Sequence, residues 1–269
     1  MKSRFSAVPY LVWMVIFIVA PLLMVAYFAF TTADGSWTID NISQVGEFAP
    51  VLMRSIWLAL IATAICLVLS YPLSYIISRM NAGGQRTMIM LVMLPMWMNF
   101  LLRTYAWMSL LENNGLINKL FGLVGLGPFN MINTPGAVVL GMVYNYLPFM
   151  ILPLYSIMTK IDQSVIEASQ DLGANLFQVF RRVVLPISLP GITTGITMVF
   201  VPSVSTFIIS RMLGGGANLL IGDLIDIQFL GNAYNPNLGA AISLVLMILI
   251  LLCMSLLNQF DEETEGMLI

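Results

Sequence analysis

The sequence has no histidine, and only 9% of its 269 residues are charged. The lack of histidine excludes histidine-based metal sites and the Ser/His or Cys/His pairs of nucleophilic catalysis. Soluble domains carry roughly 25% charged residues. Because 59% of the residues are hydrophobic, we expect lipid rather than water to surround most of the chain. The formal net charge of −2 gives no indication of nucleic-acid binding.

Cysteine and nucleotide-binding motifs are equally scarce. Cys66 and Cys253 both lie inside apolar runs, which predicts small buried residues rather than a disulfide framework. The chain contains no Gly-x-x-x-x-Gly-Lys-Ser/Thr motif, since Gly214-Gly215-Gly216 is followed by Ala217. We therefore expect no enzyme, no metal and no cofactor on this chain, and any ATP and Mg²⁺ to be held by a partner.

Long apolar runs are what the sequence does contain. A helix needs about 20 apolar residues to cross a bilayer, and six runs qualify, at about 8–30, 56–78, 88–111, 136–159, 191–210 and 238–258. The first run is too long for a signal peptide, whose apolar part is roughly 7–15 residues, so we expect an uncleaved span. The prediction is an all-α, polytopic membrane protein with one transmembrane domain over residues 1–269.

The basic residues indicate the orientation of the spans. Lys and Arg are enriched in cytoplasmic loops. With the N-terminus inside, the inner segments hold Lys2, Arg4, Arg79, Arg86, Lys160, Arg181 and Arg182, and the outer ones hold Arg54, Arg103, Lys119 and Arg211. This bias predicts that both termini are cytoplasmic. Residues 79–87 then form a tight inner turn, and residues 160–190 form the longest inner loop.

The 160–190 loop has a regular pattern. Ser164 with Glu167 is a capping box that predicts a short helix, and Gly173 stands where a left-handed residue ends such a helix. Asn175 with Gln178 repeats the capping pattern for a second helix that runs toward Pro186. We expect a helix–turn–helix with a face of mostly small residues, formed by Val165, Ala168, Ser169 and Leu172.

The same loop resembles the EAA loop of ABC-importer permeases. The shared pattern is Glu167-Ala168-Ser169, three residues, Gly173, nine residues, then Val183-x-Leu185-Pro186. Ser169 and Val183 are conservative departures from the family's Ala and Ile. In that family the short helix is a coupling helix that docks into the ATPase subunit. The resemblance implies the MetI-like type I importer permease fold and an ATPase-coupling role for Glu167, Ala168, Ser169, Asp171, Gly173, Leu185 and Pro186.

A narrower resemblance extends over nearly the whole chain. The segments 94–99 with 103–107, 144–155, and 213–222 are similar to spermidine/putrescine permeases, more to their PotB-type than to their PotC-type subunits. The resemblance implies a heterodimer with a PotC-like permease subunit, an ABC ATPase dimer and an extracytoplasmic substrate-binding protein. It places the complex in the bacterial cytoplasmic membrane and implies ATP-driven uptake of polyamines by alternating access.

A polycation requires carboxylates and aromatic faces along its path. Asp223 and Asp226 are spaced i, i+3 in an otherwise apolar segment, and carboxylates at membrane depth indicate function. The alternative is that both lie at the outer surface, in water or facing the binding protein. Trp97, Tyr105, Tyr144 and Tyr146, together with Trp107, are the aromatic candidates. Packing and interfacial anchoring are the alternative for each.

Arg103 does not suit a polycation path, because a lone cation would repel the substrate. We expect it to have a structural role, pairing with Glu112 or with the partner subunit, or extending to the interface.

Two other functions of the protein stay open. The first is an ABC permease for another small solute, such as a phosphonate, a ferric complex or an amino acid. The second is a secondary transporter or channel, which the patterned loop and the lack of an evident repeat disfavour.

Overall fold

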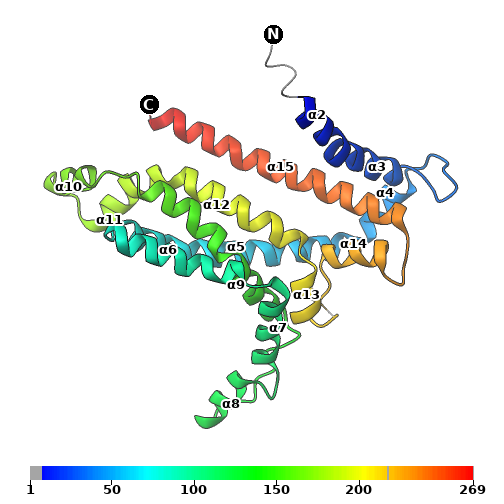
Figure 1. Cartoon of the computed structure of the whole chain (residues 1–269), viewed down its shortest axis with the longest axis horizontal. Helices are drawn as coiled ribbons and strands as arrows, with labels where there is room; N and C mark the ends of the chain where they lie inside the picture. The colour runs from blue at the N-terminus through cyan, green and yellow to red at the C-terminus, as the bar shows by residue number, and fades with distance from the viewer. Residues whose placement is uncertain (1–7, 217, 269) are drawn as a thin grey trace.

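The computed structural model describes residues 8–216 and 218–268 and is helical through nearly all of them (Figure 1). Lys2 and Arg4, counted above for orientation, lie outside the described residues. Within that part of the chain there is no β-strand, and a single isolated bridge joins Thr31 to Trp37. In chain order the segments are α2 (Val8–Met14), η1 (Val15–Val19), α3 (Ala20–Ala29), α4 (Asp40–Val45), η2 (Gly46–Phe48), α5 (Ala49–Ser78), α6 (Ala82–Trp97), α7 (Phe100–Leu111), α8 (Leu116–Leu123), α9 (Pro135–Met158), α10 (Gln163–Asp171), α11 (Leu176–Val179), η3 (Phe180–Val184), α12 (Leu185–Ser205), α13 (Ile208–Leu213), α14 (Ile221–Leu230) and α15 (Pro236–Leu268).

Helices α5, α9 and α12 pack against one another and form the centre of the molecule. Cys66 of α5 is fully buried in the apolar cluster between them, with Met150 and Leu154 of α9 and Val199 of α12. Gly195 allows α12 to approach α9 closely, because a Cβ there would lie 2.5 Å from the sulfur of Met150. The prediction that Cys66 is a small buried residue is confirmed.

The N-terminal span packs mainly against the C-terminal one. Helix α3 lies along α15, while α2 diverges from the bundle (Figure 1). The segment Val8–Ala29 is helical throughout, as expected for 8–30, and none of its most apolar stretch is buried within the chain. Its outer surface is therefore left for lipid or for another subunit.

The third expected span is not one helix. Helix α6 and the segment Phe100–Leu123, which holds α7 and α8, are bent by 89° after Trp97, so the prediction of a single helix over 88–111 is wrong. The side chain of Asn99 accepts hydrogen bonds from the backbone N–H groups of Leu101 and Leu102 and so starts a new helix inside the apolar run. Helix α6 also begins at Ala82 rather than at 88, which shortens the expected inner turn to residues 79–81.

The fifth expected span begins earlier and ends earlier than 191–210. The helix is continuous from Leu176 to Ser205, and α13 is a separate helix. Pro186 does not interrupt it, because the π-helical η3 lies directly before this proline. A π turn alters the hydrogen-bond register where proline supplies no N–H. The same arrangement precedes Pro21, where η1 lies between α2 and α3.

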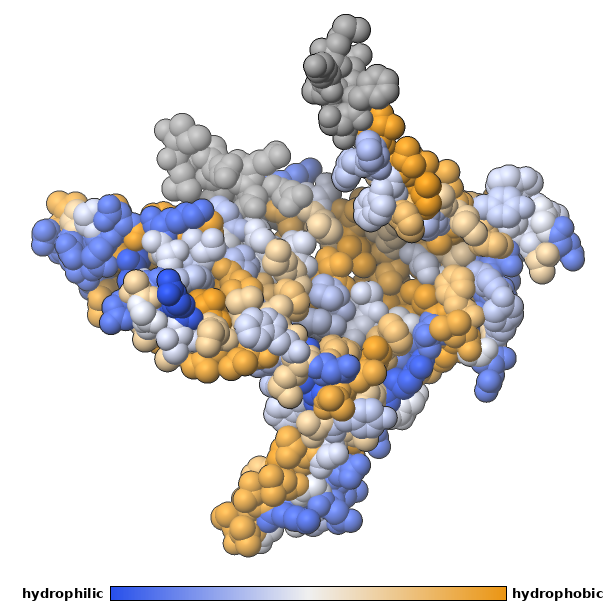
Figure 2. Space-filling model, viewed as in Figure 1, coloured by the Kyte–Doolittle hydropathy of each residue, from blue (hydrophilic) through white to orange (hydrophobic). Residues whose placement is uncertain are grey.

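By length and composition, five of the described helical stretches can cross a membrane, or six if the bent pair α6–α7 is one span. This confirms an all-α polytopic membrane protein. In Figure 2 hydrophilic side chains gather at the end formed by α10 and at the opposite end, near the loop between α3 and α4. Hydrophobic side chains cover α3 and one side of α8, whose other side is hydrophilic.

Candidate functional site

The 160–190 loop forms the tip of one end of the molecule (Figure 1). Its first helix, α10, is capped by Asp162, whose carboxylate accepts a hydrogen bond of 3.0 Å from the backbone N–H of Ser164. The expected capping box of Ser164 with Glu167 is therefore wrong, and α10 starts two residues earlier in register. Glu167 is left exposed on its surface. Hydrogen bonds from the backbone and the side chain of Ser164 hold the pKa of the Asp162 carboxyl below its ordinary value.

The end of α10 confirms the role predicted for Gly173. Its φ is +87°, a left-handed conformation. Its N–H donates to the carbonyl of Gln170 at 2.8 Å, and the N–H of Ala174 donates to the carbonyl of Ser169 at 3.1 Å. These two bonds are a Schellman motif. The second predicted capping box is also confirmed, since Asn175 and Gln178 exchange side chain-to-backbone hydrogen bonds of 2.9 Å.

The surface of this loop is unusually apolar for a polar end of the molecule. Leu172 is 90% exposed, Leu176 78% and Phe177 67%. A hollow of about 390 Å³ lies among Leu172, Gly173 and the facing residues Gln178, Val179 and Arg182. Of the predicted coupling residues, Glu167, Ala168, Asp171 and Gly173 are exposed here, and Ser169 is half-buried. Exposed apolar side chains rimmed by polar ones are typical of a protein–protein contact.

The loop is attached firmly to the spans. Ile166 is the buried side chain of α10 and packs with Ile161, Val179 and Val184 against Tyr75 of α5. Leu185 and Pro186, the last two predicted coupling residues, lie away from this tip in the first turn of α12. Leu185 packs against the central cluster. The structure therefore separates the predicted set into an exposed group on α10 and an inner group on α12.

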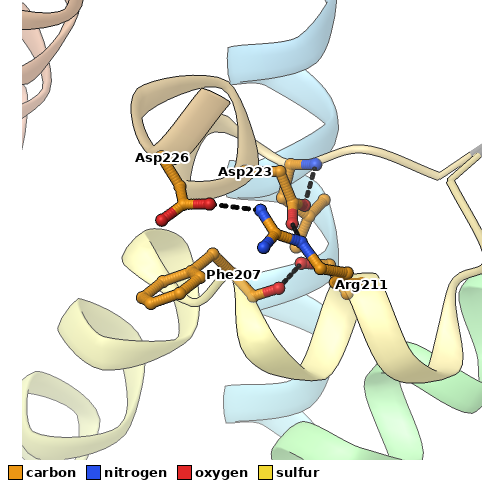
Figure 3. A network of polar contacts seen from close by, with 6 residues as sticks. Phe207, Arg211, Asp223 and Asp226 are labelled. Carbon is orange, nitrogen blue, oxygen red and sulfur yellow. Dashed lines mark hydrogen bonds and ion pairs between the residues drawn. The ribbon is translucent and has the colours of Figure 1, made fainter. Parts of the chain in front are cut away.

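A second polar group lies between α13 and α14 (Figure 3). Asp223 is fully buried, and its carboxylate accepts a hydrogen bond of 2.8 Å from the backbone N–H of Leu220. Arg211 lies 4.0 Å from Asp223 and forms an ion pair and hydrogen bond with Asp226. We call these three residues the Arg211 cluster. One guanidinium faces two carboxylates, so the cluster keeps an excess of negative charge.

The sequence drew attention to both aspartates but not to Arg211. A spacing of more than ten residues across two helices gives no periodic signal, so only the fold brings this arginine to them.

The Gly214–Gly216 run beside Arg211 has a structural role. A Cβ on Gly215 would lie 2.2 Å from the side-chain oxygen of Asn133, and the N–H of Asn133 donates to the carbonyl of Leu213.

The aromatic candidates do not gather in one place. Tyr146 lines a cavity of about 230 Å³ with Phe100 and Phe207, where the break before α7 meets the break after α12. Its hydroxyl lies 3.4 Å from the carbonyl of Pro202. Tyr144 packs edge-on against Trp107 with ring centroids 5.4 Å apart. Trp97 and Tyr105 are exposed on the surface. Tyr146 is thus the aromatic candidate that the fold places at a cavity.

Arg103 is buried, with 8% of its surface exposed, and its guanidinium lies 5.9 Å from the centroid of the Phe100 ring. Two of its nitrogens, Nε and Nη1, have no hydrogen-bond partner in the described part of the chain. The expected pair with Glu112 does not form. Both ion pairs found in the described part of the chain belong to the Arg211 cluster. Burial is against extension of the Arg103 side chain to the membrane interface, and its structural role stays a prediction.

Comparison with known proteins agrees with this architecture. Residues 3–263 match the family described as the inner membrane component of binding-protein-dependent transport systems. The chain is 37% identical over 246 residues to the spermidine/putrescine transport system permease protein PotB of Escherichia coli (strain K12), covering 88% of this chain and 89% of that protein. It is 38% identical over 252 residues to PotB of Haemophilus influenzae, covering 89% of this chain and 87% of that protein.

Solved structures show the same fold. A chain in the crystal structure of a bacterial ABC transporter for the import of alginate superposes with a TM-score of 0.78 at 16% identity, covering 97% of this chain and 95% of that one. The complex of a bacterial alginate transporter with its pentasaccharide-bound periplasmic protein matches with a TM-score of 0.76.

The fold and the 160–190 loop thus define an integral membrane permease of the ABC-importer class. The chain belongs to the family of inner membrane components of binding-protein-dependent transport systems. Members of this family that resemble it are transport permeases rather than enzymes.

Proposed function

We propose that this chain is one half of the transmembrane pore of an ATP-driven importer for polyamines. The observation that carries the proposal is the 160–190 loop, which presents Leu172 at the end of α10 and Leu176 and Phe177 of α11 to a partner. This loop occurs in a chain that is 37% identical to PotB over 88% of its length. The full complex holds a second permease subunit, two copies of an ATPase and an extracytoplasmic binding protein. Both termini and the 160–190 loop are cytoplasmic.

The geometry suits a mechanical role for α10. A short helix fixed at both ends and held by one buried side chain moves as a rigid body. When ATP draws the two ATPase subunits together, α10 follows its docking site. Because the helix is continuous from Leu176 to Ser205, this displacement reaches the far end of α12. Glu167, Ala168, Ser169, Asp171 and Gly173 form the contact, and Leu185 and Pro186 join it to the span.

The substrate path of the proposed importer passes the Arg211 cluster. A polyamine carries several ammonium groups, and the excess negative charge of Asp223 and Asp226 attracts cations by simple electrostatics. Arg211 occupies the carboxylates in this structure, so an ammonium group of the substrate competes with it. Tyr146, at the cavity between the helix breaks, offers an aromatic face for a cation. Trp97, Tyr105 and Tyr144 are weaker candidates, because two are surface-exposed and one packs against Trp107.

Uptake into proteoliposomes tests the proposal. The complete importer is reconstituted with ATP inside and radiolabelled spermidine with the binding protein outside. We expect uptake that requires hydrolysable ATP and the binding protein and that unlabelled spermidine or putrescine suppresses. No uptake of spermidine, together with ATP-dependent uptake of a radiolabelled phosphonate, ferric complex or amino acid, would show a permease for another solute. Uptake without ATP that follows an ion gradient would show a secondary transporter.

A further inference from the structure

Arg79 joins the end of α5 to the start of α10. It directly follows α5, and its Nη1 donates to the backbone carbonyl of Ile161 at 3.2 Å and to the side-chain oxygen of Gln163 at 3.3 Å. Its guanidinium lies 5.3 Å from the centroid of the Tyr75 ring, one turn earlier on α5. Ile161 and Gln163 flank Asp162, the residue that caps α10. Arg79 therefore contacts both neighbours of the residue that caps α10.

The two ends of the loop are attached to different spans. At its C-terminal end, the chain enters α11, η3 and α12 as one continuous helix. At its N-terminal end, α10 follows α9 through a short turn, and Arg79 connects this turn to α5. The apolar contact of Ile166 and Tyr75 lies beside the same junction. A displacement of α10 thus has a direct route to α12 and a separate, side-chain route to α5.

An arginine at position 79 is energetically unfavourable in part, which indicates that the geometry of its hydrogen bonds matters. Nε and Nη2 of Arg79 are buried and have no hydrogen-bond partner in the described residues. Buried donors without acceptors are unfavourable, and an apolar side chain of similar size avoids this penalty. What an apolar residue cannot supply is the directional link to the Ile161 carbonyl and Gln163. The N–H groups on these two unpartnered nitrogens also allow the guanidinium to change acceptors as the loop shifts.

We propose that Arg79 is a positioning residue that transmits the displacement of α10 to α5, and this inference rests on the importer function proposed above. With the link in place, α5 and α12 move together when the ATPase closes. Without it, α10 remains docked and drives α12, while α5 is held to α10 only by the apolar contact of Ile166 and Tyr75, so ATP is hydrolysed without a matched opening of the pore. Because the proposed partner ATPase holds the nucleotide, the effect of Arg79 is on the ratio of substrate transported to ATP hydrolysed.

The experiment measures that ratio in proteoliposomes holding the complete importer. For Arg79→Gln we expect binding-protein-stimulated ATP hydrolysis within about twofold of wild type and spermidine transported per ATP lowered about tenfold, an ordinary size for coupling between two sites. Co-purification of the ATPase with the membrane subunits is expected to be unchanged. Arg79→Lys, which keeps a cation and its donors, should recover most of the ratio. The exposed Arg86→Gln, at the start of α6, is the matched control and should leave it unchanged.

A purely structural role predicts a different result. Less complex would then be recovered, and uptake and ATP hydrolysis would fall in proportion, with their ratio preserved; that outcome overturns the proposal. If Arg79→Gln does not assemble, the exposed Gln163→Ala decides the question, because it removes one acceptor without burying a new group. A wild-type ratio for Gln163→Ala in that case also overturns it. If the wild-type complex itself shows no ATP-driven uptake, the importer function fails rather than the role of Arg79.

Discussion

At the scale of single residues, Gly173 has a conformation that few other residues adopt. A Cβ at this position meets no atom within 4 Å, so the constraint is the φ of +87° and not space. An ordinary L-residue pays about 1–2 kcal/mol there, and a β-branched one more. We expect Gly173→Val to turn α10 away from its docking site and to lower spermidine uptake at least about tenfold, since 1.4 kcal/mol corresponds to a factor of ten. Immunoblotting of membranes should show normal levels of the subunit.

Asparagine provides the matched control for Gly173, because it tolerates the left-handed conformation. Gly173→Asn should retain most of the uptake. Equal loss in both variants would show that the glycine is needed for close contact with a partner rather than for its backbone. Wild-type uptake with Gly173→Val would contradict the coupling role of the loop.

The Arg211 cluster allows a test of the substrate path. Replacing Asp223 and Asp226 together with Asn removes both negative charges, while the amide oxygen at position 223 can still accept from the N–H of Leu220. We expect the KM for spermidine uptake to rise about tenfold, the effect of losing roughly 1.4 kcal/mol of charge attraction at an effective dielectric near 20. Initial rates over a range of spermidine concentrations measure this. Unchanged kinetics would remove both residues from the path.

At the scale of helices, the start of α10 distinguishes the observed cap from the expected one. Asp162→Ala removes the acceptor that caps the helix, so hydrogen exchange of the first-turn amides should quicken about fivefold, as for a typical N-cap. Ser164→Ala keeps the backbone N–H that Asp162 binds and should have a smaller effect. Hydrogen–deuterium exchange read by mass spectrometry on the purified complex compares the two. The opposite ranking would restore the capping box of Ser164 with Glu167.

What the sequence predicted well at this scale depends on local chemistry. The turn at Gly173 and the capping box of Asn175 with Gln178 involve residues at most five positions apart, and both are confirmed. The spans 8–30 and 136–159 follow from apolar length alone. The break at Asn99 was missed because apolar residues lie on both sides of it, so a hydropathy window sees one run. The signal available was an N-cap residue shortly after Pro95.

Rules based on local sequence did not predict the helix boundaries and contacts that depend on tertiary packing. The second helix of the 160–190 loop was predicted to run toward Pro186, before a span starting at 191, but η3 accommodates this proline and one helix continues through it. Arg211 contacts Asp223 and Asp226 on a different helix, and Arg79, which follows α5, contacts Ile161 in the turn before α10. No spacing in the sequence predicts these pairs, because they depend on how the helices pack.

At the scale of the whole molecule, the scarcity of charge and its placement at the two ends fit a chain that crosses a membrane repeatedly. The loop between α3 and α4 lies at one end and α10 at the other (Figure 1). The orientation proposed from the basic residues then has a direct consequence. Residues 31–39 face the outside, and the 160–190 loop faces the cytoplasm. The chain has only two native cysteines to remove, Cys66 and Cys253, so single reporter cysteines are practical.

We expect a membrane-impermeant maleimide to label Ala33→Cys in intact cells and Gln170→Cys only after the membrane is opened. Both positions are exposed in the structure, so access depends on the side of the membrane and not on burial. Both variants are made in a background with Cys66 and Cys253 replaced by Ala, and the unsubstituted background is the control for labelling of other proteins. Labelling of Gln170→Cys from outside would reverse the orientation and remove α10 from reach of any ATPase. Labelling of both in intact cells would mean that the chain has an even number of spans between them, as happens if the bent pair α6–α7 enters and leaves the membrane on the same side, so that only α5 and α9 cross.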